Sequence, residues 1–230
     1  MKGITDTTQF VRNHDWKKNQ IIDPIGTPPD RFAPLSGNNN YRSGKIASFE
    51  QLKMLKKKYG IKRVVNLALD SMKHQQDPNF NCGGMEAPCE PLWAEELGLE
   101  YFPAYLSARP PSPDKWEVIK AMLAKGNTLI HCTHGVDRTG AVAGAWRKTI
   151  EPEVTNETIL PYTYAFGGQW KMASDPNRHL RDFILNAQYD PAVRSAVDRS
   201  MRFNLPLIFG GIAFAALGGA IYWRFFRKLS

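Results

Sequence analysis

The sequence predicts an α/β fold, with a central, mostly parallel sheet flanked by helices and a C-terminal transmembrane helix beyond it. Two observations predict the sheet. Short β-branched runs alternate with helical stretches over residues 41–187, and the buried run 128–132 leads through a glycine-containing loop into a helix. A third observation predicts the membrane helix, because residues 203–223 contain no charged side chain.

Composition divides the chain into five segments. The first is polar and rich in turn formers, and the last three are basic, apolar and basic in turn. The segments are a polar N-terminal lead over 1–40, the folded domain over 41–187, a basic linker over 188–202, the transmembrane helix over 203–223 and a basic tail over 224–230.

Local signals place the elements of the folded domain in order. Ser48 followed by Gln51 is a capping box, which opens a helix that ends before Gly60. Ser112 with Pro113 opens another helix, which runs to about residue 125. The remaining expected elements are strands over 61–69, 99–106 and 128–132, and helices near 92–97, 139–150, 155–165 and 176–187.

The charge of the chain lies mostly at its C-terminal end. The formal net charge of +8 by itself suggests a nucleic-acid partner. However, residues 194–230 carry six basic residues and one acidic residue, and so supply +5 of that charge. This distribution disfavours a nucleic-acid partner without excluding one.

Three cysteines are too few for a disulfide scaffold. Cys82 and Cys89 flank the stretch GGMEAP, where they either pair or remain two reduced thiols, and we expect reduced thiols because the rest of the chain is typical of an intracellular protein. The sequence has no further pair of Cys or His residues at metal-ligand spacing. It therefore predicts no metal and no other cofactor.

The uncharged stretch 203–223 is long enough to cross a bilayer. Its 21 residues would form a helix of about 31 Å, against a hydrocarbon core of about 30 Å. Arg202 precedes it, Arg224 follows it, and Tyr222 with Trp223 occupies an interfacial position. The alternative is a buried core helix. The N-terminus has no apolar signal segment, so we expect a single-pass protein whose folded domain stays in the cytosol.

The loop HCTHGVDRTG, residues 131–140, carries the chemistry. It lies between a buried strand and a helix, where backbone amides gather around one point and bind anions. Gly135 leaves room for the approach of an anion, and the planar fork of Arg138 matches two phosphate oxygens. The amides of residues 133–138 are thus the expected substrate-binding groups. They include those of Thr133, His134, Val136 and Asp137.

Cys132 is the expected nucleophile. The amides and the Arg138 cation favour its thiolate form, which can attack a bound phosphorus atom. Thr139 can donate its hydroxyl to that thiolate when it departs in a second step. His131 is expected to orient the loop from below, whereas His134 either shapes the loop rim or contacts substrate.

The C-x5-R-T-G pattern resembles the active-site loop of the cysteine-dependent protein tyrosine phosphatase superfamily, in particular its compact dual-specificity type. The stretches YRSGKIASFEQLKMLKKKYGIKRVVNL and YAFGGQWKMASDPNRHLRDFIL are similar to the opening and the closing helices of those enzymes. The resemblance covers about residues 41–187. It implies their fold, and a phosphatase that acts on phosphorylated proteins through a phosphocysteine intermediate. Together with the stretch 203–223, we expect this phosphatase to be tethered to a membrane.

The general acid departs from the pattern that the resemblance implies. Such phosphatases carry an aspartate about thirty residues before the cysteine, where this chain has Ser107 and Arg109. Asp137 is the preferred candidate, since the lipid-directed myotubularins have Asp-Arg-Thr at this position. Asp114 is the second, although its place in the first turn of a helix suits it to the helix dipole.

Three alternatives remain open. The HCTHG stretch also looks like the loop of RNA 5′-triphosphatases of the same superfamily, whose phosphoanhydride substrate needs little acid catalysis. A phosphoinositide phosphatase is the second alternative, and a phosphate-reading scaffold without turnover is the third.

Overall fold

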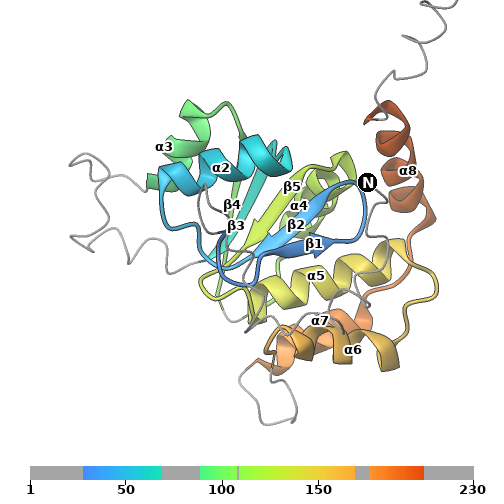
Figure 1. Cartoon of the computed structure of the whole chain (residues 1–230). Helices are drawn as coiled ribbons and strands as arrows, with labels where there is room; N and C mark the ends of the chain where they lie inside the picture. The colour runs from blue at the N-terminus through green and yellow to red at the C-terminus, as the bar shows by residue number, and fades with distance from the viewer. Residues whose placement is uncertain (1–27, 69–88, 108, 169–176, 205–230) are drawn as a thin grey trace, which may run out of the picture.

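The structure is a computed structural model that describes residues 28–68, 89–107, 109–168 and 177–204 (Figure 1). A five-stranded sheet of order β1-β2-β5-β3-β4 forms its centre. The strands are β1 (Ala33–Leu35), β2 (Asn40–Ser43), β3 (Arg63–Ala68), β4 (Glu100–Leu106) and β5 (Thr128–His131). β1 is antiparallel to β2, and the other three pairings are parallel. The predicted α/β class with a mostly parallel sheet is confirmed.

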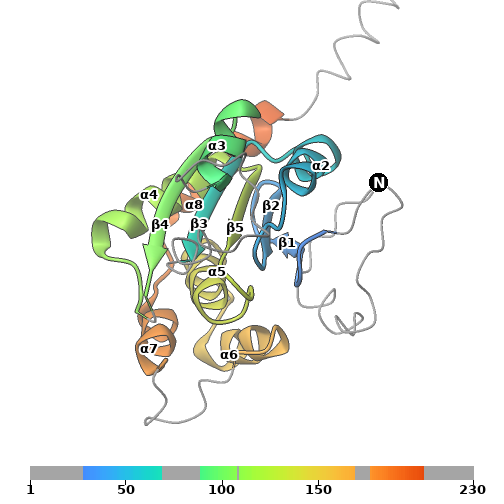
Figure 2. The same ribbon diagram turned by 90° about the vertical axis from the view of Figure 1, so that its left-hand side faces the viewer.

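Helices cover both faces of this sheet (Figures 1 and 2). α2 (Phe49–Tyr59) and α3 (Cys89–Glu96) lie on one face. The other face carries α4 (Pro113–Lys125), α5 (Asp137–Ile150), α6 (Asn156–Ala165), α7 (Arg178–Asn186) and α8 (Pro191–Asn204). Neighbouring strand residues alternate between the two cores, as the period of a strand requires: Val64 packs with α2 and α3, and Val65 with α4 and α5.

The predicted capping residues open and close α2, although the Gln51 side chain bonds the amide before Ser48 rather than that of Ser48 itself. The Ser48 hydroxyl accepts a hydrogen bond from the Gln51 amide, and the Gln51 side chain accepts one from Ala47 N at 2.7 Å. Gly60 ends α2 with φ +67°, a conformation that glycine adopts without strain. α4 begins at Pro113 behind the Ser112 cap. The helices and strands expected within the described part of residues 41–187 are all present.

The two short strands β1 and β2 were not expected. β1 also lies inside the segment 1–40, which we expected to be a polar lead. A three-residue strand is too short to show an alternating pattern. β2 shows none either, because its buried residues are polar. The Asn40 side chain, for example, bonds both Leu123 O and Thr128 N. Residues 28–40 are therefore part of the folded domain.

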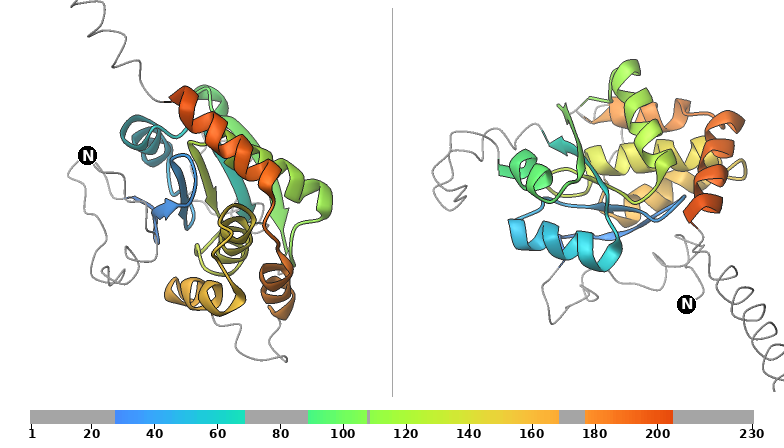
Figure 3. Two further views of the ribbon diagram at one scale, coloured as in Figure 1. Left: turned by 90° about the vertical axis from the view of Figure 1, so that its right-hand side faces the viewer. Right: turned by 90° about the horizontal axis from the view of Figure 1, so that it is seen from above.

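The segment 188–202, expected to be a basic linker, contains most of α8. Asp190 caps this helix by accepting hydrogen bonds from Ala192 N and Val193 N, and Pro191 occupies its first position. α8 runs alongside α4 (Figure 3) and buries Val197. The net charge suggested a linker, but Arg194 pairs with Asp198 within the helix and donates to Ile150 O, so the charges do not prevent its packing.

Among the helices of the described residues, none has the length and apolar character needed to cross a bilayer. The predicted span 203–223 lies outside the described residues, apart from its first two positions in α8. The membrane helix therefore stays a prediction.

The packing of α8 predicts a stability difference within one helix. Val197 is 1% exposed, whereas Met201 is 36% exposed. Val197→Ala removes two buried methyl groups and leaves a cavity, so we expect it to lower the free energy of unfolding by about 2 kcal/mol. Met201→Ala is the control and should change it by less than about 0.5 kcal/mol. Urea unfolding measures both, and equal small effects would mean that α8 does not pack on the domain.

Candidate active site

Strand β5 delivers Cys132 to the carboxyl edge of the sheet. Because β3, β4 and β5 are parallel, their carboxyl ends meet at this edge, and the loop that carries Cys132 leads from it into α5. The Cys132 side chain is buried, with 2% of it exposed. The loop after β4 and the loop after β5 are thus neighbours around the thiol.

The carbonyl groups of three successive loop residues point outward. Thr133 O accepts a hydrogen bond from Lys45 N at 3.1 Å, and His134 O accepts one from Arg31 Nη1 at 2.8 Å. Gly135 O accepts one from Arg42 Nη2 at 2.6 Å. In a trans peptide the N–H group points away from the carbonyl, so the amides that follow these carbonyls face the opposite side. Inward-facing successive amides form a nest for an anion.

Gly135 is required by the close approach of this loop to β2. Its φ of +68° lies in the left-handed region. A Cβ atom there would lie 2.6 Å from Gly44 N and 2.7 Å from the carbonyl carbon of Ser43. The expected role of Gly135 was to clear the path of the anion. The structure adds that it allows the outer side of the loop to rest on the end of β2.

Arg138 joins the two loops at the carboxyl edge. Its Nη1 donates to Leu106 O, the last residue of β4, and its Nη2 donates to the hydroxyl of Thr133, both at 3.2 Å. These bonds hold the guanidinium beside the phosphate loop, with part of its surface exposed. Arg138 therefore lies where a fork for phosphate oxygens is needed.

The other predicted loop residues surround this centre. Val136 occupies the N-cap position of α5, and Asp137 is the first residue of the helix, where a carboxylate also stabilises the helix dipole. Thr139 is buried, and its hydroxyl donates to Ser43 O at 3.5 Å. The predicted donation to the departing Cys132 thiolate stays a prediction. The side chain of His134 is exposed at the rim.

A buried polar pair lies before the nucleophile. His131 Nε2 is 2.7 Å from Glu90 Oε1, and the two side chains are 1% and 11% exposed. Asn66 donates to Glu90 at 3.3 Å and to the Tyr101 hydroxyl at 3.0 Å. Burial raises the pKa of Tyr101, and the Glu90 carboxylate adds to the increase. The predicted role of His131 in orienting the loop stays a prediction, and Glu90 was not predicted.

Arg31 and Arg42 were also missed by the sequence analysis. Both precede the predicted helices, and neither belongs to a recognisable hydrophobic pattern. Arg42 is completely buried, and its guanidinium lies 3.8 Å from the centroid of the Phe166 ring. A single cationic residue beside a short strand gives no signal of its own, so only the pairing of β2 with β5 shows its place.

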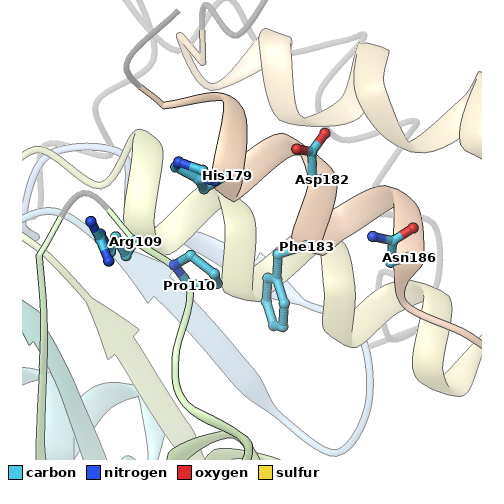
Figure 4. Close-up of a pocket in the computed structure, with 6 residues that line it drawn as sticks. All are labelled: Arg109, Pro110, His179, Asp182, Phe183 and Asn186. Atoms are coloured by element: carbon cyan, nitrogen blue, oxygen red, sulfur yellow. The ribbon is translucent and has the colours of Figure 1, made fainter. Parts of the chain in front are cut away.

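A hollow of about 530 Å³ lies at the loop after β4 (Figure 4). Arg109 and Pro110 form one side, and α7 forms the other. The residues of α7 that line it are His179, Asp182, Phe183 and Asn186. Arg109 follows Leu106 by three residues, so the hollow lies on the loop that begins where Arg138 donates its hydrogen bond to Leu106 O.

The candidate acids lie on different elements. Asp137 belongs to the phosphate loop itself, whereas Asp114 is exposed in the first turn of α4. Within the described ranges, no three Cys, His, Asp or Glu side chains group as metal ligands do.

Comparison with known proteins finds likeness in structure alone. No family model and no curated sequence matches the chain. The core catalytic domain of the PP-IP phosphatase SIW14 from S. cerevisiae, in complex with citrate, is similar with a TM-score of 0.51 and 21% identity, over 75% of this chain and 93% of that one. A second structure of the Siw14 catalytic core gives 0.51 and 19%, over 78% and 95%. TpbA from P. aeruginosa gives 0.49 and 19%, over 78% and 95%.

The likeness to the two Siw14 structures concerns the fold alone. The loop at residues 131–140 is a separate observation on this chain. Cys132 follows the central strand β5, and Arg138 stands six residues later at the start of α5. The chain therefore has the fold of the Siw14 catalytic core, and it carries a C-x5-R loop at residues 132–138 between β5 and α5.

Proposed function

We propose that this chain is a cysteine-dependent phosphatase of dual-specificity type that hydrolyses phosphomonoesters of phosphotyrosine, phosphoserine or phosphothreonine in proteins. The observation that carries the proposal is the loop around Cys132, whose carbonyls at Thr133, His134 and Gly135 are all bonded from outside. The remaining polar groups of such a loop suit a bound phosphoryl group.

The reaction has two steps. The Cys132 thiolate attacks phosphorus, the P–O bond to the leaving group breaks, and the leaving oxygen takes up a proton. Water then attacks the phosphocysteine, the S–P bond breaks, and inorganic phosphate leaves with the thiolate restored. Arg138 and the amides of residues 133–138 hold the three equatorial oxygens in both steps. This route uses no metal ion and no organic cofactor.

Asp137 is the proposed proton donor of the first step and the base of the second. It stands next to Arg138 at the start of α5, and part of its surface is exposed. Asp114 is the second candidate, because it follows the loop after β4.

Cleavage of a phosphoanhydride is the second candidate function. A specific observation favours it: the loop after β4 holds Ser107 and Arg109 where the related enzymes have an acid. An anhydride has a good leaving group and needs little acid catalysis. The likeness to a PP-IP phosphatase supports this alternative. An RNA 5′-triphosphate is also an anhydride, whereas a phosphoinositide is a phosphomonoester with a poor leaving group. A panel of all these substrates therefore decides between the expected alternatives.

The proposed location is a membrane, through residues 203–223, with the catalytic domain in the cytosol. The uncharged stretch between Arg202 and Arg224 supports the tether. Phosphorylated membrane-associated proteins are then the nearest substrates. A scaffold that binds phosphate without turnover is the non-enzymatic alternative, and turnover of an aryl phosphate excludes it.

Replacement of the nucleophile tests the covalent route. Cys132→Ser should lower the turnover of p-nitrophenyl phosphate by at least about a thousandfold, because a serine hydroxyl is not ionised at neutral pH. Inorganic phosphate should still bind, because the amides and Arg138 remain. Cys82→Ser is the matched control and should keep full activity. Retained turnover in Cys132→Ser would falsify the phosphocysteine intermediate.

The proton donor is tested through the leaving group. Asp137→Asn should slow phosphoserine peptides by about a hundredfold or more and p-nitrophenyl phosphate far less, because nitrophenolate leaves without a proton. Asp114→Asn should cost only about 0.3–1 kcal/mol of stability through its helix. A leaving-group effect in Asp114→Asn alone assigns the acid to that residue. No such effect in either variant favours an anhydride substrate.

The membrane tether is tested by fractionation. The full-length chain should sediment with membranes and resist carbonate extraction. A chain that ends after Asn204 keeps all of α8 and should stay in the supernatant with the same rate on p-nitrophenyl phosphate. A full-length chain that remains in solution without detergent contradicts the tether.

A further inference from the structure

Arg42 occupies an unusual position for a charged side chain. It is 0% exposed and lies on β2, which pairs with β5 so that Arg42 is opposite Ile130, two residues before Cys132. The neighbouring register pair is Ser43 with His131. The strand pairing thus places a guanidinium directly behind the phosphate loop.

The guanidinium has few partners for its five N–H donors. Nη2 donates to Gly135 O at 2.6 Å, and the plane lies over the Phe166 ring at 3.8 Å. Nε and Nη1 have no hydrogen-bond partner, and no carboxylate pairs with Arg42, among the residues that the structure describes. A buried charge without a counter-ion is costly, so another group must offset this cost.

A second guanidinium in the same layer shows the ordinary arrangement. Arg147 lies over the Tyr162 ring at 4.7 Å, and Tyr162 packs against Phe166 with ring centroids 5.4 Å apart. Arg147, however, pairs with Glu151 at 2.7 Å. The two arginines therefore share one aromatic pair, but only Arg147 has a carboxylate partner in the described part of the chain.

The electrostatic neighbours of Arg42 include Cys132. Burial lowers the pKa of Arg42, Tyr162 and Cys132 oppose this decrease, and the nearby Arg31 adds to it. Arg31 and Arg42 bond successive carbonyls of the loop, at His134 and Gly135. Two cations on the outer side of one small loop are stabilised when an anion lies on its inner side.

We propose that Arg42 is a positioning residue of the phosphate site: its buried charge offsets the negative charge of the Cys132 thiolate and the bound phosphoryl group, and its bond to Gly135 O fixes the inward direction of the loop amides. This inference rests on the proposed phosphatase function and adds a second guanidinium to it. Arg138 contacts the phosphoryl oxygens from the front, whereas Arg42 acts through the loop from behind.

Loss of the Arg42 charge should weaken phosphate binding without lowering the thermal stability of the chain. In the full-length Cys132→Ser chain, held in mild detergent, Arg42→Met keeps the packing on Phe166 and removes the charge. The thermal midpoint without ligand should stay equal or rise, because an unpaired buried charge is lost. The affinity for inorganic phosphate, measured by calorimetry, should fall by about tenfold or more. Arg42→Lys keeps the charge and should recover much of that affinity.

Arg147→Met is the matched control, since it removes the other guanidinium of the same aromatic pair. It leaves Glu151 without its partner, so the thermal midpoint should fall while the phosphate affinity stays the same. If Arg42→Met and its parent bind phosphate with equal affinity, the proposed role of Arg42 is wrong, but the proposed phosphatase function is not affected. An Arg42→Met chain that does not fold also overturns the role of Arg42, because the charge would then serve the fold. A Cys132→Ser parent that binds no phosphate overturns this inference together with the proposed function.

Discussion

The parallel pairing of β2 with β5 is the constraint on which the site depends. It brings residues 28–45 against the outer side of the loop 132–138, where Lys45 N, Arg31 and Arg42 each bond one loop carbonyl. A loop of this length has many conformations in isolation, and each bonded carbonyl removes some of them. The amides are consequently oriented before a ligand arrives, which is the usual source of electrostatic stabilisation in enzymes.

The site also holds buried polar groups that a core without function would avoid. Glu90 and His131 form a buried pair on one side of the nucleophile, and Arg42 lies buried on another. Groups of this kind lower the stability of a fold unless they are paired, and they gather where chemistry needs them. The surrounding apolar layers, with Trp146 completely buried on α5 and Val65 on β3, supply the stability that offsets this cost.

The reaction and the substrate depend on different parts of the molecule. The loop after β5 and Arg138 suit any phosphoryl group, and they do not distinguish a protein from a lipid or a nucleotide. Selection must come from the surroundings, and the hollow between Arg109 and α7 is one such feature near the loop after β4. Its lining holds a cation at Arg109 and an anion at Asp182, together with the aromatic ring of Phe183.

The sequence by itself determined the elements with strong local signals and the chemistry confined to one short loop. The caps at Ser48 and Ser112, the strand–loop–helix around Cys132 and the place of Arg138 follow from neighbours in the chain, so they could be predicted. Only the tertiary structure decided what crosses long sequence separations: β1 and β2 at the edge of the sheet, α8 on α4, and the contacts of Arg42 with Gly135 and of Glu90 with His131. These depend on strand pairing and on buried polar contacts, and neither leaves a periodic pattern in the sequence from which it could be read.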